Sequence, residues 1–479
     1  MTQKSLARLV RDGVFWLTAV KLSGQLLSWT ITVYVMRILS PSDYGLVAMA
    51  GIFIGFVILF NEFGLSAAII QRKDLEREDL SGIFWSVLCM NLALYGACFV
   101  SAPAVAAFYD EPRLVDVMRI AALTFILRSI GLVSNNMLTR ELAFNRQSQA
   151  ALIGNAAGAL ATLLLALEGA GVWSLVYGSL IGEGTANLLL MLFYPWKPAF
   201  AISFSRVRLL IQFGYKVAVA RLFWYLSSNM DLLIAGKVLG RTQVGYYAVA
   251  VQFALIPLDK LVSTVAQVAF PAFSKVQDDA ALLRRYYLKI ANLVSFVTFP
   301  VCWGIFLVAD SAVPLLLSDK WQPVVLPLQI LSMVTSLRAL HILNAPLETA
   351  LAKPEITICN FVIITLFLSA RFIVGSAYGL EGLAYSWLVF PIVFLITTSI
   401  TLRLIKLPLV DYFRELRHPF LGTAVMVIAV LTIQTAFLAG RSLATRAAGT
   451  VAVGILAYFL YFAVFNRQIF TEARAIFRK

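Results

Sequence analysis

The sequence is poor in charge and in the residue types that build most catalytic and metal sites. Only 13% of its 479 residues are charged, whereas soluble globular domains carry roughly a quarter. It has 2 histidines, and its 4 cysteines all lie in apolar runs without the spacing of metal ligands. The ATP-binding pattern GxxxxGK[ST] is absent. These features exclude a soluble enzyme and lead us to expect no catalytic residue, no metal and no cofactor.

Hydrophobic residues are what the chain has in excess. They make up 60% of the sequence, and the mean hydropathy is +0.85. A transmembrane helix needs about 20 mostly apolar residues, and continuous runs of that length recur along the chain, unlike the short alternating segments of barrel strands. We therefore predict an all-α polytopic membrane protein with about 14 transmembrane helices. The predicted spans are 13–36, 43–69, 81–108, 117–138, 148–167, 170–193, 207–236, 243–270, 288–317, 324–352, 356–378, 379–402, 419–440 and 445–465.

Lysine and arginine are distributed unevenly between alternate loops. If the N-terminus is cytoplasmic, most loop cations fall on the cytoplasmic side, and the positive-inside rule then places both termini there. The net charge of +14 is thereby explained by topology, and we expect the lipid bilayer and no nucleic acid as a partner. The other side holds Arg37, Arg113, Lys237, Arg241, Lys320, Arg441 and Arg446.

The stretch 36–51 contains a tight polar turn that recurs two hundred residues later. Arg37 aligns without gaps with Lys237, and Gly45 aligns with Gly245. Each copy is interpreted as helix, short loop, helix in the same orientation, which indicates a parallel repeat about an axis along the membrane normal. A chance likeness of two helical hairpins is the alternative. The predicted architecture is two pseudo-symmetric six-helix lobes, 1–206 and 207–404, followed by a C-terminal helix pair with its cytoplasmic tail, 405–479.

The residues of the first turn suit a short, stiff connection. Pro41 fixes φ in the turn, and Ser40 or Asp43 is expected to cap the helix that follows. Gly45 has no side chain to obstruct close approach of another segment. We expect such a loop to make the first two helices of each lobe move together.

More cationic than acidic residues remain inside the predicted helices. Ionisable groups at membrane depth cost a few kcal/mol, so they usually face water or a partner. A surplus of cations suits an anionic cargo such as a pyrophosphate, which arginine binds bidentately and lysine as a point charge. The cations are Lys21, Arg119, Arg128, Lys216, Arg221, Lys260, Arg338 and Arg371, and the acids are Glu62, Glu183, Asp231, Asp259, Asp310 and Glu348.

Depth within the predicted helices selects the candidate binding residues. Cations near helix ends can extend to the surface. Those more than two turns from either end are assigned to a cationic cavity for an anion such as a phosphate or pyrophosphate, with buried ion pairs as the alternative: Lys21, Arg128, Arg221 and Arg338. Further polar residues of the cavity are predicted from helical spacing: Gln25 and Ser28 follow Lys21 at i+4 and i+7, and Tyr225 and Ser228 repeat this stripe after Arg221.

Two residues near Arg338 are candidates for coupling transport to an ion. His341 lies one turn from Arg338 and shares a helix face with Glu348. A histidine changes charge near neutral pH and so suits a proton site, although a hydrogen-bonded structural histidine is the alternative. H+ or Na+ is the expected coupling ion.

Four motifs resemble the polysaccharide transporter branch of the multidrug, oligosaccharidyl-lipid and polysaccharide exporter superfamily, which includes O-antigen and exopolysaccharide flippases. They are RILSPSDYGLVAMA from residue 37, NEFGLSAAIIQR from residue 61, FPAFSKVQDD from residue 270 and DKWQPVVLPLQIL from residue 319. The resemblance implies alternating access between two lobes in a bacterial inner membrane. It also implies a cargo, an undecaprenyl-pyrophosphate-linked oligosaccharide moved to the periplasmic leaflet, and a polymerase and a chain-length regulator as partners.

Three other functions stay open at this stage. A peptidoglycan lipid-precursor flippase would carry the same pyrophosphate. A cation-coupled drug exporter of the superfamily would favour acidic residues in the cavity, whereas the surplus here is basic. A membrane glycan polymerase or ligase would need acid and base groups gathered in a large outer loop, and the predicted outer loops are short.

Overall fold

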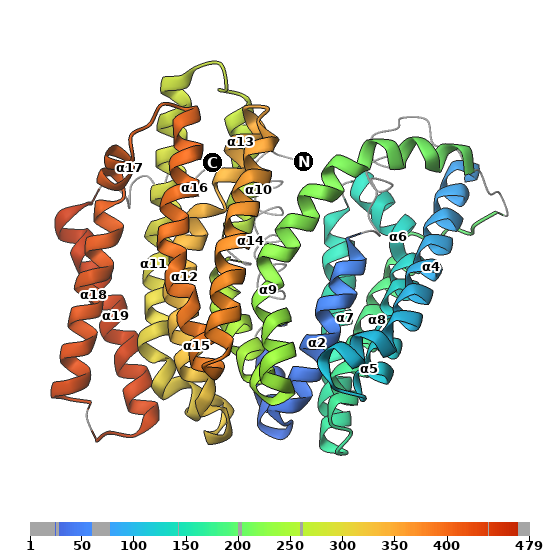
Figure 1. The fold of residues 1–479 in the computed structure, drawn as a ribbon, viewed down its shortest axis with the longest axis horizontal. Coiled ribbons are helices and arrows are strands. Elements are labelled where there is room, and N and C mark those ends of the chain that lie inside the picture. Colours follow the sequence, from blue (N-terminus) through green and yellow to red (C-terminus); the bar gives the residue numbers. More distant parts are fainter. Residues whose placement is uncertain are drawn as a thin grey trace, which may run out of the picture. The chain divides into compact units, whose positions relative to one another are not determined.

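Helices and short turns make up the part of the chain that the computed structural model describes, residues 24, 28–59, 77–141, 143–199, 204–258, 262–438 and 440–467 (Figure 1). The first half contains α2 (Pro41–Ile58), α4 (Arg77–Tyr109), α5 (Leu114–Ala121), α6 (Thr124–Arg140), α7 (Phe144–Leu167), α8 (Val172–Phe193) and α9 (Phe204–Pro257). The second half contains α10 (Ser263–Ser274), α11 (Ala280–Leu317), η2 (Asp319–Val324), α12 (Val325–His341), α13 (Asn344–Ala350), α14 (Pro354–Ser376), α15 (Gly379–Ser386), η3 (Trp387–Val389), α16 (Phe390–Leu404), α17 (Leu409–Glu415), α18 (Arg417–Ala436) and α19 (Leu443–Phe465).

The described residues form 11 helical segments that are long and apolar enough to cross a membrane. Each coincides with a predicted span, which confirms an all-α, multi-pass membrane protein. The predicted spans 207–236 and 243–270 fall on α9 and α10. The predicted span 13–36 lies largely outside the described residues, so a total of about 14 stays a prediction.

Helix α9 consists of two helices that meet at a kink in the second copy of the repeated turn. The kink is at Gly240, whose φ of 76° lies in the left-handed region that glycine adopts without steric cost. This break lies between the predicted spans 207–236 and 243–270, as expected, and it is confined to one residue with non-helical φ and ψ.

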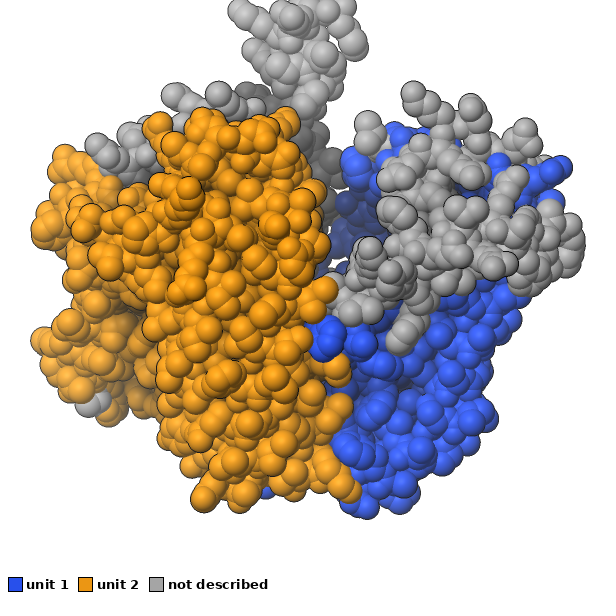
Figure 2. Space-filling model, turned by 45° about the horizontal axis from the view of Figure 1, so that its top comes forward, with its two compact units in different colours: residues 1–225, 240–245 blue, residues 226–239, 246–479 orange. Residues whose placement is uncertain are grey.

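The described chain divides into two compact units, shown in different colours in Figure 2. The first comprises the residues up to Tyr225 together with Gly240–Gly245, and the second comprises Leu226–Leu239 and the residues from Tyr246 onward. Helices α18 and α19 belong to the second unit, where they pack against each other and against α11 (Figure 1). The three-part division at residues 206 and 404 stays a prediction.

The start of α2 follows from its local sequence. Asp43 accepts a hydrogen bond from the backbone N–H of Ser40 at 3.0 Å, and Pro41 occupies the first helical turn, as expected of a capped N-terminus. A Cβ on Gly45 would overlap the carbonyl oxygen of Arg241, and a Cβ on Gly245 would overlap that of Pro41. Both contacts lie within the first unit. The two contacts are equivalent, because Gly245 and Arg241 are the residues that align with Gly45 and Pro41 in the repeat.

Within the first unit, α7 and α8 pack closely through glycines. A Cβ added to Gly158 would lie 2.8 Å from the carbonyl oxygen of Gly178, and one added to Gly154 would lie 2.7 Å from that of Gly182. Membrane helices associate through such small residues because lipid supplies no hydrophobic force between them. This contact holds α8, which carries Glu183, close against α7.

Candidate functional site

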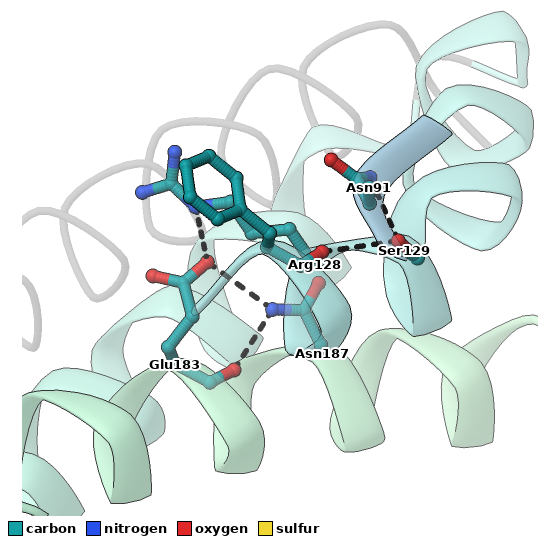
Figure 3. A network of polar contacts seen from close by, with 6 residues as sticks. Asn91, Arg128, Ser129, Glu183 and Asn187 are labelled. Atoms are coloured by element: carbon teal, nitrogen blue, oxygen red, sulfur yellow. Dashed lines mark hydrogen bonds and ion pairs between the residues drawn. The ribbon is translucent and has the colours of Figure 1, made fainter. Parts of the chain in front are cut away.

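An ion pair lies at mid-depth in the first unit. Arg128 on α6 and Glu183 on α8 each lie near the middle of a span, Leu114–Arg140 and Val172–Phe193. The Nε of Arg128 donates to Oε1 of Glu183 at 3.0 Å (Figure 3). The two residues are 55 positions apart in the sequence, so helical spacing does not reveal the pair.

Glu183 is held in place from its own helix. Asn187, one turn along α8, donates from Nδ2 to the Glu183 backbone carbonyl at 2.8 Å and to Oε1 at 3.3 Å. Gly131 on α6 makes room for this amide, because a Cβ there would overlap Oδ1 of Asn187. The arginine therefore binds to a carboxylate that Asn187 orients from the same helix.

The ion pair is open to its surroundings although it lies at bilayer depth. The side chains of Arg128 and Glu183 are 41% and 30% exposed. A charge pair facing hydrocarbon would cost several kcal/mol, so we place this exposed face in water rather than in lipid. Figure 3 shows the two terminal nitrogens of Arg128 directed away from Glu183. They form a fork that fits two oxygens of an anion.

A second cluster surrounds Arg338 in the second unit. The guanidinium of Arg338 lies 4.7 Å from the ring centroid of Trp387, a cation–π geometry. The indole Nε1 donates to the hydroxyl of Tyr247 at 2.7 Å, and that hydroxyl donates to Oδ2 of Asp231 at 2.8 Å. Asp231, Tyr247 and Trp387 are buried, and the Arg338 charge interacts electrostatically with Asp231. Arg338 is thus bound to a buried polar chain along one side.

The helix face that His341 and Glu348 are predicted to share stays a prediction. Helix α12 ends at His341 and α13 begins at Asn344, and the two residues between them keep a helical backbone conformation. The His341 ring packs edge-on against Phe390 with 6.2 Å between centroids, and its Nε2 is buried without a hydrogen-bond partner. Glu348 is instead enclosed by donors from α14 and α16.

The remaining predicted site residues are less informative. Lys21 and Gln25 lie outside the described residues, and so does the side chain of Arg221. The carbonyl of Ser28 accepts from Thr32, and Ser228 lies partly buried on α9. Tyr225 donates to the carbonyl of Ile52 on α2 at 2.6 Å. The two predicted polar stripes therefore stay predictions.

Several residues at these sites are not predicted by helical spacing or depth. Glu183 and Asp231 are predicted only as acids inside helices, and Trp387 and Tyr247 lie within predicted spans without a motif that marks them. Among the described residues no group of three or more His, Cys, Asp and Glu could hold a metal ion.

Comparison with known sequences identifies the family. A family profile described as polysaccharide biosynthesis protein matches residues 34–326. The chain is 28% identical to the teichuronic acid biosynthesis protein TuaB of Bacillus subtilis, covering 84% of each chain. It is 26% identical to the lipopolysaccharide biosynthesis protein WzxC of Escherichia coli, over 74% of this chain and 73% of the relative. The succinoglycan biosynthesis transport protein ExoT of Rhizobium meliloti is also 26% identical, over 67% of this chain and 65% of the relative.

Solved structures show the same fold at low sequence identity. The lipid II flippase MurJ in an inward closed conformation superposes with a TM-score of 0.74 at 14% identity, over 94% of this chain and 100% of that one. An inward-facing multidrug resistance transporter of the MATE family gives 0.60 at 15% identity, over 81% and 99%. The chain therefore belongs to the polysaccharide biosynthesis protein family and has the membrane fold of MurJ and the MATE transporters.

Proposed function

We propose that this protein is a flippase of surface polysaccharide biosynthesis. Its cargo is an undecaprenyl-pyrophosphate-linked oligosaccharide, which it moves by alternating access from the cytoplasmic to the periplasmic leaflet of a bacterial inner membrane. It is a transporter and not an enzyme. The family match, a relative described as a succinoglycan biosynthesis transport protein, and the fold shared with a lipid II flippase support this proposal.

The observation that carries the proposal is the geometry of Arg128. An exposed arginine at the middle of a span, bound through Nε alone, keeps its terminal nitrogens for two oxygens of a pyrophosphate. Glu183 holds the arginine through Nε and so fixes the direction in which the terminal nitrogens point. The acid at this site, Glu183, already pairs with Arg128, so the site does not favour a drug cation.

The Arg338 cluster supports a second contact with the cargo. Trp387 and Asp231 orient the guanidinium from one side, and cation–π contact with an indole is strong where water is excluded. Lys21 and Arg221 remain predicted members of the binding site. We assign no role to a polymerase or a chain-length regulator beyond the expectation that they act on the exported cargo.

A test in cells separates export from folding. In a strain whose own flippase gene is deleted, Arg128→Ala should abolish surface polymer and cause lipid-linked repeat units to accumulate, with the protein present in the membrane in normal amount. Arg119→Ala is the matched control, because Arg119 lies on the same span but stacks on Phe99 at 4.1 Å near the helix end. Normal surface polymer in the Arg128 variant would remove Arg128 from the mechanism.

A further inference from the structure

A carboxylate in the second unit is enclosed more completely than any other acid among the described residues that lie in spans. Glu348 on α13 is 1% exposed. Its Oε2 accepts from the hydroxyl of Thr357 at 2.5 Å, and its Oε1 accepts from the Asn360 amide at 2.8 Å and from the hydroxyl of Thr401. The donors come from α14 and α16. The cage formed by Glu348, Thr357, Asn360 and Thr401 is thus built by three helices.

Among the described residues no cation forms an ion pair with this carboxylate. A buried carboxylate without a cationic partner is unfavourable in its ionised form, even when it is hydrogen-bonded, because its desolvation is only partly offset. The neutral acid is the form that this closed cage favours.

The charged groups on the helices that pack against α13 do not neutralise Glu348, so the neutral acid is still the favoured form. Helix α10 carries no charged side chain between Ser263 and Ser274. The other helices carry Arg338 and His341 on α12, Glu355 and Arg371 on α14, and Arg403 on α16. None of these groups forms an ion pair with Glu348. Tyr287 of α11 is the titratable group that faces the cage, through its hydrogen bond to Asn344 at 2.8 Å and its electrostatic interaction with Glu348.

The cage can satisfy Glu348 in both protonation states. The hydroxyl of Thr401 has a second acceptor, the backbone carbonyl of Thr397 at 3.2 Å. When Glu348 binds a proton on Oε1, this O–H donates to Oγ1 of Thr401, and the Thr401 hydroxyl turns to the Thr397 carbonyl. Asn360 still donates to Oε1 and Thr357 to Oε2. One hydrogen bond reverses its direction, and none is lost.

We propose that Glu348 is a proton-binding site, with Thr401 as the hydroxyl that adapts its hydrogen bonds to the proton. Each cycle binds one proton from water on Oε1 as the cage closes, and returns it to water when α13, α14 and α16 separate. Glu348 lies two residues from the end of the span Asp319–Ala350, so the path to the aqueous boundary is short. The coupling of this proton to cargo movement rests on the proposed function, but proton binding itself does not.

Histidine 341 is the weaker candidate for the same role. It lies one turn from Arg338, and a second positive charge at that position would be repelled by the guanidinium. Its unpartnered Nε2 also has no described carboxylate to accept a proton from it. The structure therefore separates two residues that the sequence could not rank.

The first experiment measures proton binding directly on the full-length protein in lipid. Infrared difference spectra recorded between acidic and alkaline buffer should show the carbonyl stretch of a protonated carboxylic acid that disappears in Glu348→Gln. Glu355→Gln is the matched control, because Glu355 is exposed on α14 beside Lys353. Thr401→Ser should leave the frequency of the band in place, and Thr401→Val should shift it. A band that persists in Glu348→Gln would overturn the proposal.

The second experiment asks whether the proton drives transport. In proteoliposomes the rate of flipping of extracted lipid-linked oligosaccharide should respond to a pH gradient in the wild type, and Glu348→Gln should lose this response. Loss of the infrared band upon adding Na+ at constant pH would show a sodium site and overturn the proton proposal. A Glu348 band in a protein that flips no lipid-linked oligosaccharide would refute the proposed function and leave the proton site standing.

Discussion

At the scale of single residues, the choice of arginine at position 128 has a chemical reason. An ammonium is one point charge, whereas a guanidinium can bind a carboxylate through Nε and a phosphate through its two terminal nitrogens at the same time. Arg128 makes the first of these contacts with Glu183. Under the proposed function we expect Glu183 to be a positioning residue, which fixes the direction of the fork without contacting the cargo.

This positioning role predicts different effects for two substitutions of Glu183. Glu183→Ala removes the acceptor and should raise the half-saturating cargo concentration about tenfold, the loss expected for one charged hydrogen bond. Glu183→Gln keeps an acceptor oxygen and should have a smaller effect. Flipping rates measured over a range of cargo concentrations in proteoliposomes distinguish the two. A positioning role would be contradicted if both variants lowered the maximal rate equally and left the half-saturating cargo concentration unchanged.

The Trp387 ring has two separable functions. Trp387→Phe keeps an aromatic face beneath Arg338 but removes the Nε1 donor to Tyr247, and should cost about 1 kcal/mol of stability. Trp387→Leu also removes the cation–π contact and should reduce cargo binding by Arg338. Thermal unfolding in detergent measures the first effect, and the cargo dependence of flipping measures the second. Wild-type transport by Trp387→Leu would show that the ring has no part in presenting Arg338.

At the scale of helices, the repeated turn is where the sequence foretold most about packing. Gly45 was expected to permit close approach, and the close neighbour is the copy of its own motif around Gly245. The capping of α2 by its Ser-Pro-Ser-Asp start was expected as well, because capping depends only on neighbours in the sequence. Features of this kind are local, or are repeated along the chain, and a single sequence therefore reveals them.

Equivalent substitutions in the two copies should have equivalent effects. Gly45→Ala and Gly245→Ala each place a methyl group against a backbone carbonyl, and each should destabilise the protein by about 1–3 kcal/mol through overpacking. Gly51→Ala on the same helix is the control, since a Cβ there meets no atom within 4 Å. Thermal unfolding of the three variants checks this prediction. A Gly51 variant as unstable as the Gly45 variant would show that helix flexibility, and not close approach, is what the glycines provide.

At the scale of the whole molecule, hydropathy predicted the membrane spans because the bilayer imposes their length and apolar composition. It also separated the two helices that meet at Gly240, since a polar stretch between two apolar runs indicates a turn. The candidate site was predicted less well. Depth in a helix identified Arg128 and Arg338, but Glu183, Asp231 and Trp387 reach them only through tertiary contacts that no periodicity encodes.

The central claim is that an exposed arginine at bilayer depth binds the pyrophosphate of a lipid-linked sugar. Its most direct test is the flipping of extracted lipid-linked oligosaccharide by purified protein in liposomes, compared between the wild type, Arg128→Ala and the control Arg119→Ala. We predict that Arg128→Ala loses flipping while Arg119→Ala retains the wild-type rate. Flipping by Arg128→Ala at the wild-type rate would contradict the account.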